Sequence, residues 1–386
     1  MVMDIAVIDG AESDRIRREE QAAGLFTQQR RLEETHVLHR AEFHGNAREY
    51  FGIWVVNTLF TLLTLGLYAP WAKVRRNRYF HANTTLSGFA FDYHATGGQL
   101  LKGWLLVAVY LIGYNLIVDT YPLASLGVLA VVLGIFPWLV ERALRFKAKV
   151  TSYRNLRFHF HGKLSKAYIS VLLGGLLGLF SVGLLAPIFS KIYYRYMFDG
   201  VSYGGRRFET TGRIWSIYKT IWLPAVVLIV GLLPASVVMA YVLSKEFSLM
   251  PREIMLDSWW RAIFHMLFSY VAIIPFLLAY YLMLIVYRTG VRNVMWSAAT
   301  FDGKHRLVSD IPRMRYAWIL ISNTVVTILS LGLLRPWAAV RERRFLVAFT
   351  GIWITGDIEE LHAELETSGS AFGSEFMDSD GFDLGF

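Results

Sequence analysis

The sequence predicts an all-α polytopic integral membrane protein with small β-hairpins outside the bilayer, built on a threefold internal repeat of helical-hairpin or re-entrant units. Three observations lead to this fold class: the composition, the lengths of the apolar blocks, and a motif that occurs three times. Of the 386 residues, 55% are hydrophobic and 18% are charged, whereas soluble domains carry about 25% charged residues. The chain is therefore too apolar for an ordinary soluble protein.

The apolar residues collect in seven blocks, most of them near the roughly 20 residues that a helix needs to span a bilayer. In chain order the blocks cover residues 50–70, 99–121, 123–141, 167–190, 214–243, 259–287 and 314–336. Polar tails flank them at 1–40 and 357–386, and the second tail holds nine acidic residues and no Lys or Arg. We expect a membrane domain over 41–356 followed by a disordered acidic tail. The first tail lacks the apolar core of a cleavable signal peptide.

The composition excludes several kinds of site. The chain has no cysteine, which excludes disulfides, iron–sulfur clusters, zinc fingers and a cysteine nucleophile. The formal charge of +9 is better explained by Lys and Arg beside membrane spans than by nucleic-acid binding. The usual motifs of hydrolases, kinases and dinucleotide-binding enzymes do not occur, so we expect neither an enzyme nor a cofactor.

An octapeptide motif recurs in the first, fourth and seventh blocks. It reads TLGLYAPW at 64–71, SVGLLAPI at 181–188 and SLGLLRPW at 330–337. Seven of the eleven residues at 57–67 are identical at 323–333. The repeat units therefore cover about 43–97, 160–212 and 301–356, and they alternate with transmembrane hairpins at about 99–141 and 214–287.

Short β-patterned stretches lie between the blocks. Segments 86–94, 155–162 and 201–211 alternate aromatic and polar residues around turn-forming glycines, so we expect small hairpins outside the bilayer. A Phe-x-Gly triplet also precedes each repeat block, at 43–45, 160–162 and 301–303. It lies 21 residues before the central glycine of the motif in the first two copies and 29 residues before it in the third.

The distribution of basic residues favours hairpins that return to the side they left. If each repeat block leaves and returns on one side, the loops on the two sides of the membrane hold 28 and 2 Lys or Arg residues, as the positive-inside rule requires. The motif offers the turn, because Gly can end one helix at its C′ position and Pro can begin the next. Single crossings remain the alternative, since Lys73 and Lys191 lie early in the second leg.

The run from Asn57 to Phe91 resembles the YjgN family of bacterial inner-membrane proteins, a domain of unknown function. The run combines an Asn-Thr pair, the motif, and a following cluster of basic residues in one register. The resemblance covers about residues 41–356 and leaves the acidic tail outside. It implies a multi-pass protein of the bacterial inner membrane and no activity. The distribution of basic residues, with returning hairpins, places both tails in the cytoplasm.

Arginines follow the motif at equivalent positions. Trp71, Arg75 and Arg78 share one helical face, and the same spacing recurs later in the chain. The candidate residues for binding an anion or an anionic lipid headgroup are Arg75, Arg78, Arg195, Arg341 and Arg344. They could bind lipid phosphate at the interface, or Arg78, Arg195 and Arg344 could form a ring around a pseudo-threefold centre.

Other polar residues fall within the apolar blocks, where burial favours a partner or a pathway. These candidates are Asn57, Asn323, Lys219 and His265. Asn57 and Asn323 suit helix–helix packing better than a substrate role. A metal site could also be drawn with His44, His161 and Asp302, but a shared strand ending requires no metal.

Two functions from different classes follow. The first is a non-catalytic membrane scaffold or partner subunit, with the acidic tail binding a protein partner and the basic residues binding anionic headgroups. The alternative is a transporter or channel for a small anion or anionic lipid, using the repeated arginines. The absence of a recognisable transport motif favours the scaffold.

Overall fold

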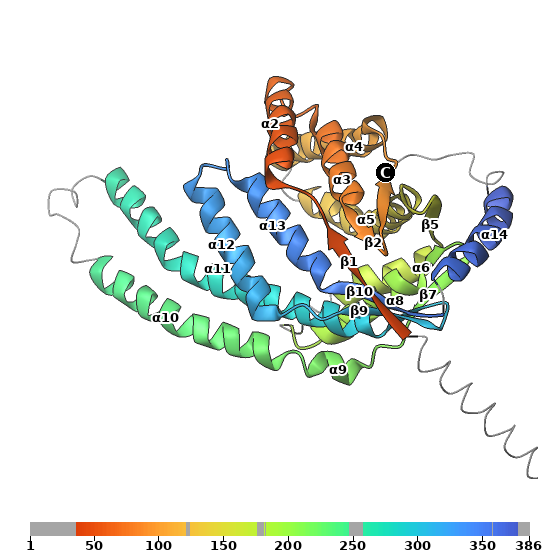
Figure 1. Cartoon of the computed structure of the whole chain (residues 1–386). Coiled ribbons are helices and arrows are strands. Elements are labelled where there is room, and N and C mark those ends of the chain that lie inside the picture. Colours follow the sequence, from red (N-terminus) through yellow and green to blue (C-terminus); the bar gives the residue numbers. More distant parts are fainter. Residues whose placement is uncertain are drawn as a thin grey trace, which may run out of the picture.

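The fold is a closed antiparallel β-barrel that carries helical hairpins on one rim (Figure 1). The structure is a computed structural model, and it describes residues 36–120, 124–175, 181, 183–246, 258–356 and 358–376. The expectation of an all-α protein is therefore wrong, because the strands of the described residues close into one barrel. The expected hairpins at 86–94, 155–162 and 201–211 are parts of this barrel.

Ten strands form the barrel in the described residues. They are β1 (His36–Phe43), β2 (Thr84–Leu86), β3 (Phe89–Tyr93), β4 (Thr151–Tyr153), β5 (Leu156–Phe160), β6 (Val201–Tyr203), β7 (Arg206–Thr210), β8 (Ala299–Phe301), β9 (His305–Ser309) and β10 (Thr350–Thr355). Each strand pairs with the next, and β1 closes the barrel by pairing with both β2 and β10. β1 begins inside the expected N-terminal tail 1–40, of which residues 1–35 lie outside the described part.

Helical segments connect alternate strands and form five hairpins in the described part of the chain. They are α2 (Ala47–Leu63) with α3 (Ala69–Ala82), α4 (Gly97–Thr120) with α5 (Ala124–Lys149), α6 (Leu164–Ala167) and η1 (Tyr168–Leu173) with α8 (Ala186–Asp199), α9 (Ile214–Tyr218) and α10 (Trp222–Glu246) with α11 (Ser258–Ser297), and α12 (Arg313–Leu329) with α13 (Arg335–Ala348). Each hairpin starts after an odd-numbered strand and ends before an even-numbered one. All five therefore rise from the same rim.

The core of the barrel is aromatic. Phe91 lies opposite Tyr153, and Phe158 lies opposite Tyr203. These side chains belong to one cluster to which several strands contribute, so they point into the barrel. Some of their neighbours along the strands, such as Arg157, are exposed, because successive residues of a strand face opposite sides. Others, such as Ser152, are buried.

Helix α14 (Ile358–Phe376) covers the rim opposite the hairpins, where the β-turns lie. Leu361 and Leu365 pack on the aromatic cluster, and Glu359 forms an ion pair of 2.6 Å with Arg154. Residues 358–376 therefore differ from the disordered tail that their acidic composition predicts. The rest of 357–386 lies outside the described residues.

The turns of the short hairpins satisfy their own backbone groups. After α2 the Gly66 N–H bonds to the Thr61 carbonyl at 2.7 Å, and the Thr64 hydroxyl accepts the Tyr68 N–H at 3.0 Å. This is a Schellman ending, repeated after α12. The sequence pattern predicts Gly66 at the left-handed C′ position. In the structure Leu65 occupies this position (φ 51°), and Gly66 is the next residue. Backbone paired in this way can enter hydrocarbon.

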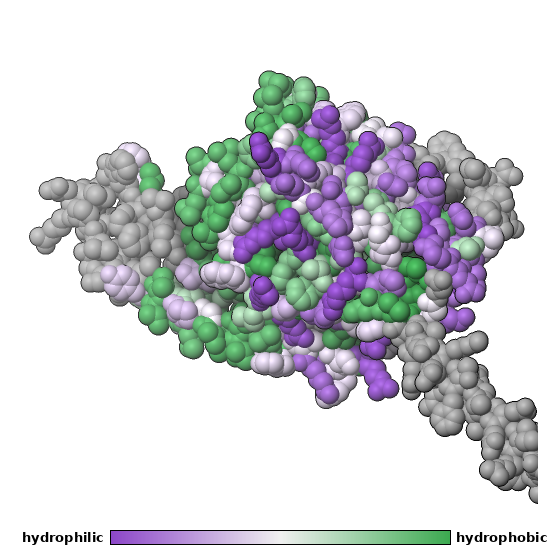
Figure 2. All heavy atoms as spheres, in the orientation of Figure 1, coloured by the Kyte–Doolittle hydropathy of each residue, from purple (hydrophilic) through white to green (hydrophobic). Residues whose placement is uncertain are grey.

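The hairpins expose apolar surface away from the barrel (Figure 2). The turn residues Leu65 and Leu331 are each 93% exposed, and Leu184 is 75% exposed. Among the described residues, three helical stretches are long and apolar enough to cross a membrane: Leu126–Lys149, Ile214–Tyr241 and Ile273–Ser297. All three belong to the two longer hairpins.

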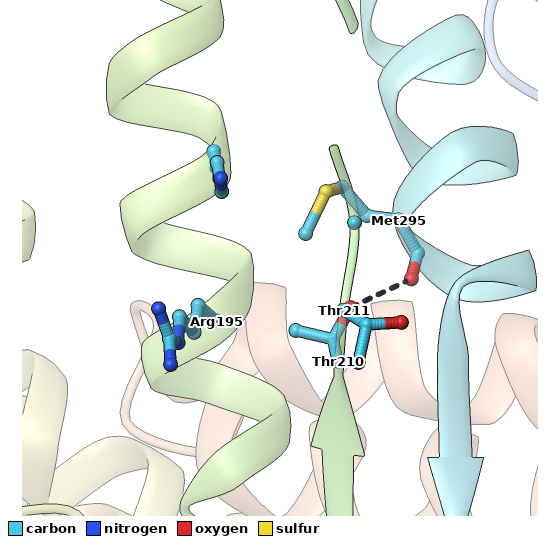
Figure 3. A pocket seen from close by; sticks show the side chains of 6 residues that line it. Arg195, Thr210, Thr211 and Met295 are labelled. Carbon is cyan, nitrogen blue, oxygen red and sulfur yellow. Dashed lines mark hydrogen bonds between the residues drawn. The ribbon is translucent and has the colours of Figure 1, made fainter. Parts of the chain in front are cut away.

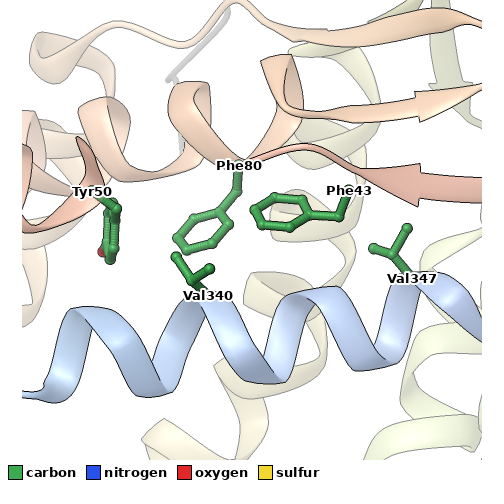
Figure 4. Close-up of a cluster of buried hydrophobic side chains, with 5 residues drawn as sticks. All are labelled: Phe43, Tyr50, Phe80, Val340 and Val347. Atoms are coloured by element: carbon green, nitrogen blue, oxygen red, sulfur yellow. The ribbon is translucent and has the colours of Figure 1, made fainter. Parts of the chain in front are cut away.

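The first and last hairpins are packed together at the closure of the barrel. Figure 4 shows Phe43, Tyr50 and Phe80 stacked over Val340 and Val347 of α13. Phe43 ends β1, so this cluster joins the barrel closure to both hairpins. The first and fifth hairpins are consequently neighbours, whereas a threefold arrangement of the motif-bearing hairpins would place all three at equal distances.

Candidate functional site

A cleft of about 150 Å³ lies where the third hairpin meets the barrel (Figure 3). Lys191 and Arg195 contribute from α8, and Met295 contributes from α11. The remaining lining comes from the end of β7 and the residues after it, Thr210, Thr211 and Gly212. The cleft is open on one side, so a solute or a lipid headgroup can reach both cations.

Helix geometry places the two cations together. Lys191 and Arg195 are four residues apart on α8 and therefore share one face. Asp199, one turn further on, bonds to the Arg195 Nε at 3.2 Å through one carboxylate oxygen. Its other oxygen accepts the Thr210 N–H at 3.1 Å, which ties α8 to the end of β7. The Arg195 side chain remains 65% exposed and can take a second partner.

Gly212 packs closely against Met295 on the wall of the cleft. A Cβ at Gly212 would lie 2.7 Å from the sulfur of Met295, so the Met295 side chain would have to move to admit one. The Thr211 N–H bonds to the Ala298 carbonyl at 3.1 Å and holds the strand end against α11. The wall is therefore a closely packed crossing of β7 and α11.

The chemistry of this cleft suits an anion. Two cationic side chains face one carboxylate, that of Asp199, and a guanidinium donates paired hydrogen bonds to phosphate or carboxylate oxygens. The sequence predicts Arg195 as a ligand but does not single out Lys191. The signal for Lys191 is its position four residues before Arg195, which places the two side chains on one helical face.

The other predicted arginines lie elsewhere. Arg75 and Arg78 are exposed on α3. Arg341 donates to the Asn323 side-chain oxygen at 2.9 Å and lies 5.2 Å from the Trp337 ring, and Arg344 donates to the Gly45 carbonyl at 3.1 Å. In the described residues these arginines have separate surroundings and do not form the proposed ring. The motif-bearing hairpins are the first, third and fifth of five around the barrel. Because the first and fifth are neighbours and the third is not next to either, a threefold axis does not relate them.

The two predicted asparagines bridge the legs of their hairpins. The Asn57 side chain donates to the Ala72 carbonyl at 3.4 Å, and Asn323 donates to the Ala338 carbonyl at 3.1 Å. Both are buried, and the equivalent geometry supports the packing interpretation.

The two remaining intramembrane candidates lie in the fourth hairpin. Lys219 is exposed at the break between α9 and α10. His265 is part of α11, but its side chain lies outside the described residues.

The three residues of the possible metal site, His44, His161 and Asp302, do not lie close to one another. His44 bonds to the Thr85 hydroxyl and His161 to the Ser202 hydroxyl, each at 3.0 Å. Asp302 lies in the β8–β9 turn at the opposite rim and pairs with Arg206. No three His or acidic residues of the described part cluster closely enough to hold a metal.

The position equivalent to His44 in the fifth hairpin is Asp310, which follows β9 as His44 follows β1. The irregular spacing of 29 residues indicates that the triplet Phe301-Asp302-Gly303 is not equivalent to the Phe-x-Gly triplets at 43–45 and 160–162. Counted from Ile311, two residues after the end of β9, the distance to Gly332 is 21 residues, as in the other copies. Sequence reasoning also missed His94, which follows β3 and bonds to the Ser152 hydroxyl at 2.7 Å.

Residues 38–379 match the model of a family described as bacterial protein of unknown function (DUF898). The chain belongs to this family. The match begins in β1 and runs past α14, so the acidic segment lies inside the family region and not outside it. The predicted resemblance to the YjgN family is confirmed by the names of the similar proteins below.

Proteins named inner membrane protein YjgN are similar to this chain. The Salmonella typhimurium protein is 26% identical over 361 residues, which cover 84% of this chain and 90% of that protein. The Escherichia coli O157:H7 protein is also 26% identical, over 206 residues that cover 44% of this chain and 52% of that protein. No solved structure matches this member of the DUF898 family.

Proposed function

We propose that the protein is a non-catalytic scaffold of the bacterial inner membrane that holds anionic phospholipid headgroups at the cytoplasmic surface. The observation that carries this proposal is the cleft of Lys191 and Arg195, on the helix that follows an exposed apolar turn. The two longer hairpins would span the bilayer, and the three short ones would enter it from the side of the barrel.

The spacing along α8 fits the dimensions of a bilayer. Arg195 lies 11 residues after Leu184, which is about 16 Å along a helix. Half of the hydrocarbon core is about 15 Å thick. A turn that reaches the middle of the bilayer would therefore hold Arg195 at the level of the headgroups.

The first and fifth hairpins support the same arrangement. Arg75 lies 10 residues after Leu65, and Arg341 lies 10 residues after Leu331. Both would be about 15 Å from the turn, again near the headgroups. The arginines of the motif thus act as interfacial ligands on separate hairpins, and the transport alternative has no single path lined by them in the described residues.

The names of the similar proteins support the location, and the 28 to 2 distribution of basic residues supports a cytoplasmic barrel. The partner-subunit role expected for the acidic tail has less support. Glu359, Leu361, Glu364 and Leu365 of α14 are already engaged by the barrel of the same chain.

Binding of phosphatidylglycerol to the full chain in nanodiscs tests the headgroup proposal. Lys191→Ala combined with Arg195→Ala should weaken binding by about tenfold or more, since each basic residue near a membrane surface contributes about 1 kcal/mol. Arg157→Ala combined with Arg207→Ala removes two exposed cations from the barrel wall and should have little effect. Equal losses from the two pairs would show that only overall charge matters, and would overturn the assignment of the cleft.

A further inference from the structure

A second group of basic residues lies where α11 and α13 meet the rim of the barrel. Arg292 of α11 donates to the Ser309 hydroxyl at 3.0 Å and to the Thr350 hydroxyl at 2.9 Å. Its guanidinium lies 4.9 Å from the centre of the Trp296 ring. The last turns of this long helix therefore belong to the barrel, although the helix also carries a candidate membrane span.

Arg343 of α13 reaches the same part of the rim. It donates to the Thr84 hydroxyl at 3.3 Å. Thr84 begins β2 and Thr350 begins β10, and these two strands flank β1 in the barrel. Thr84 pairs with Phe43 of β1, and the register places Thr350 level with Ala41. The two positions are thus two strand spacings and two residues apart, about 12 Å, and the charges of Arg292 and Arg343 are close enough to repel each other.

Two buried donors in this region have no acceptor in the structure. The Nε of Arg343 and the indole Nε1 of Trp296 are both shielded from solvent without a hydrogen bond. A buried donor that is left unpaired costs about 1–3 kcal/mol. Trp296 lies against Arg292, whereas Arg343 reaches the rim on the other side of β1. The unpaired donors and the two positive charges therefore lie around the same part of the rim.

The two arginines differ from the paired arginines of the barrel: among the described residues, neither Arg292 nor Arg343 has an acidic side chain within ion-pair distance. The positive field extends to His81, whose pKa is lowered by burial and also by the charges of Arg343 and Lys147. Partly buried cations normally acquire an anionic partner.

We propose that Arg292, Arg343 and Trp296 form an internal site for one oxyanion of the phosphate class. The donors belong to α11 and α13, and a tetrahedral oxyanion has acceptors in enough directions to bond to N–H groups from both helices. Both arginines are only partly buried, which leaves a route of entry. The site is separate from the cleft of Lys191 and Arg195 and does not depend on the scaffold function.

Inorganic phosphate is the first probe. The full chain, purified in detergent, should unfold at a higher temperature in phosphate than in chloride of equal ionic strength, and calorimetry should detect one bound phosphate. Arg343→Met should reduce the affinity at least tenfold. The cleft variant with Lys191→Ala and Arg195→Ala should keep it, since the two sites are distinct.

A second measurement separates a free anion from a lipid. Phosphorus that remains with the purified protein is extracted into organic solvent and water. Phosphorus in the organic phase identifies a phospholipid headgroup as the ligand, and phosphorus in water identifies free phosphate. In either case the Arg343→Met variant should retain no bound phosphorus after purification.

Two results would overturn the proposal. One is wild-type protein with neither bound phosphorus nor a phosphate-dependent unfolding temperature, and the other is equal phosphate affinity in wild type and Arg343→Met. If Arg343→Met does not fold, Arg343→Lys keeps the charge but lacks the guanidinium fork. It should bind phosphate several-fold more weakly, and unchanged affinity would again reject the site.

Discussion

Single residues in this protein take their roles from the hairpin that holds them. Asn57 and Asn323 occupy equivalent positions and make the same bond across their hairpins, yet only Asn323 also accepts a bond from the following arginine, Arg341. The Asn57 side-chain oxygen is buried without a partner, and the equivalent Arg75 is exposed. Sequence equivalence thus predicts the packing bond and not the electrostatic contact, which depends on the rotamer of a long side chain.

His305 makes the stability of the barrel depend on pH. It is buried, and its Nδ1 accepts the Thr355 N–H at 3.1 Å, a bond that requires the neutral ring. Burial, with the charges of Lys304 and Arg206, lowers its pKa. The unfolded chain therefore binds the proton more readily than the folded one. The stabilisation is complete above the ordinary histidine pKa of about 6.5 and is lost as the pH falls toward the lowered pKa.

We expect the unfolding temperature to fall between about pH 7 and about pH 5. His305→Gln keeps an acceptor but cannot titrate in this range, so it should weaken the dependence. His44→Gln, at an exposed histidine on the outer wall, is the control. A pH profile that His305→Gln leaves unchanged would assign the effect to other groups.

Helix α14 shows how an element can be misjudged from its composition. The nine acidic residues of 357–386, without Lys or Arg, predict disorder. In the structure Glu359 pairs with Arg154 and Glu364 pairs with Arg206 at the turn rim of the barrel, each at 2.6 Å. Leu365 is 3% exposed. The compensating arginines lie about 160 and 200 residues earlier in the chain, so no local pattern reveals them.

Leu365→Asp should release α14 from the barrel. A charge placed against Tyr153, Tyr203 and Phe301 has no partner, and the lost packing alone is worth about 2–5 kcal/mol. Limited proteolysis should then cut near residue 357 much faster than in the wild type. Glu360→Ala, at an exposed position on the same helix, should not change the cleavage rate. Protection that survives Leu365→Asp would mean that the two ion pairs hold α14 without the apolar contact.

The whole molecule places its polar barrel on one side and its apolar turns on the other (Figure 2). All five described hairpins leave and return at one rim, which agrees with the returning topology that the basic residues favour. Single crossings would place the two ends of one hairpin on opposite sides of a membrane, whereas in the described residues both ends join the same rim of the barrel.

Single cysteines in this naturally cysteine-free chain test the arrangement. Cysteines at Ser87, Arg207 and Arg306, all on the barrel, should be protected from a membrane-impermeant thiol reagent in intact cells and labelled after the cells are opened. Leu331→Cys, at an apolar turn, should resist the reagent in both conditions. Labelling of any barrel position in intact cells would contradict a cytoplasmic barrel.

The sequence by itself determined the apolar character, the family, the helix–turn–helix segments at the three motifs, and the alternation of short and long hairpins. Each of these depends on interactions between residues close in the chain: a run of apolar side chains, a Ser or Thr that caps a turn, and a Gly and a Pro at fixed spacing. Such signals can be read without knowing where the rest of the chain lies.

Only the tertiary structure decided that the β-segments close into a barrel, that α14 covers it, and that the arginines do not meet at a threefold centre. Strands of three residues, such as β2 and β4, are too short to show a period of two. Barrel closure pairs His36 with Thr355, across almost the whole chain. The partners that decide these features are distant in sequence, and the free energy of their contacts exists only once the chain is folded.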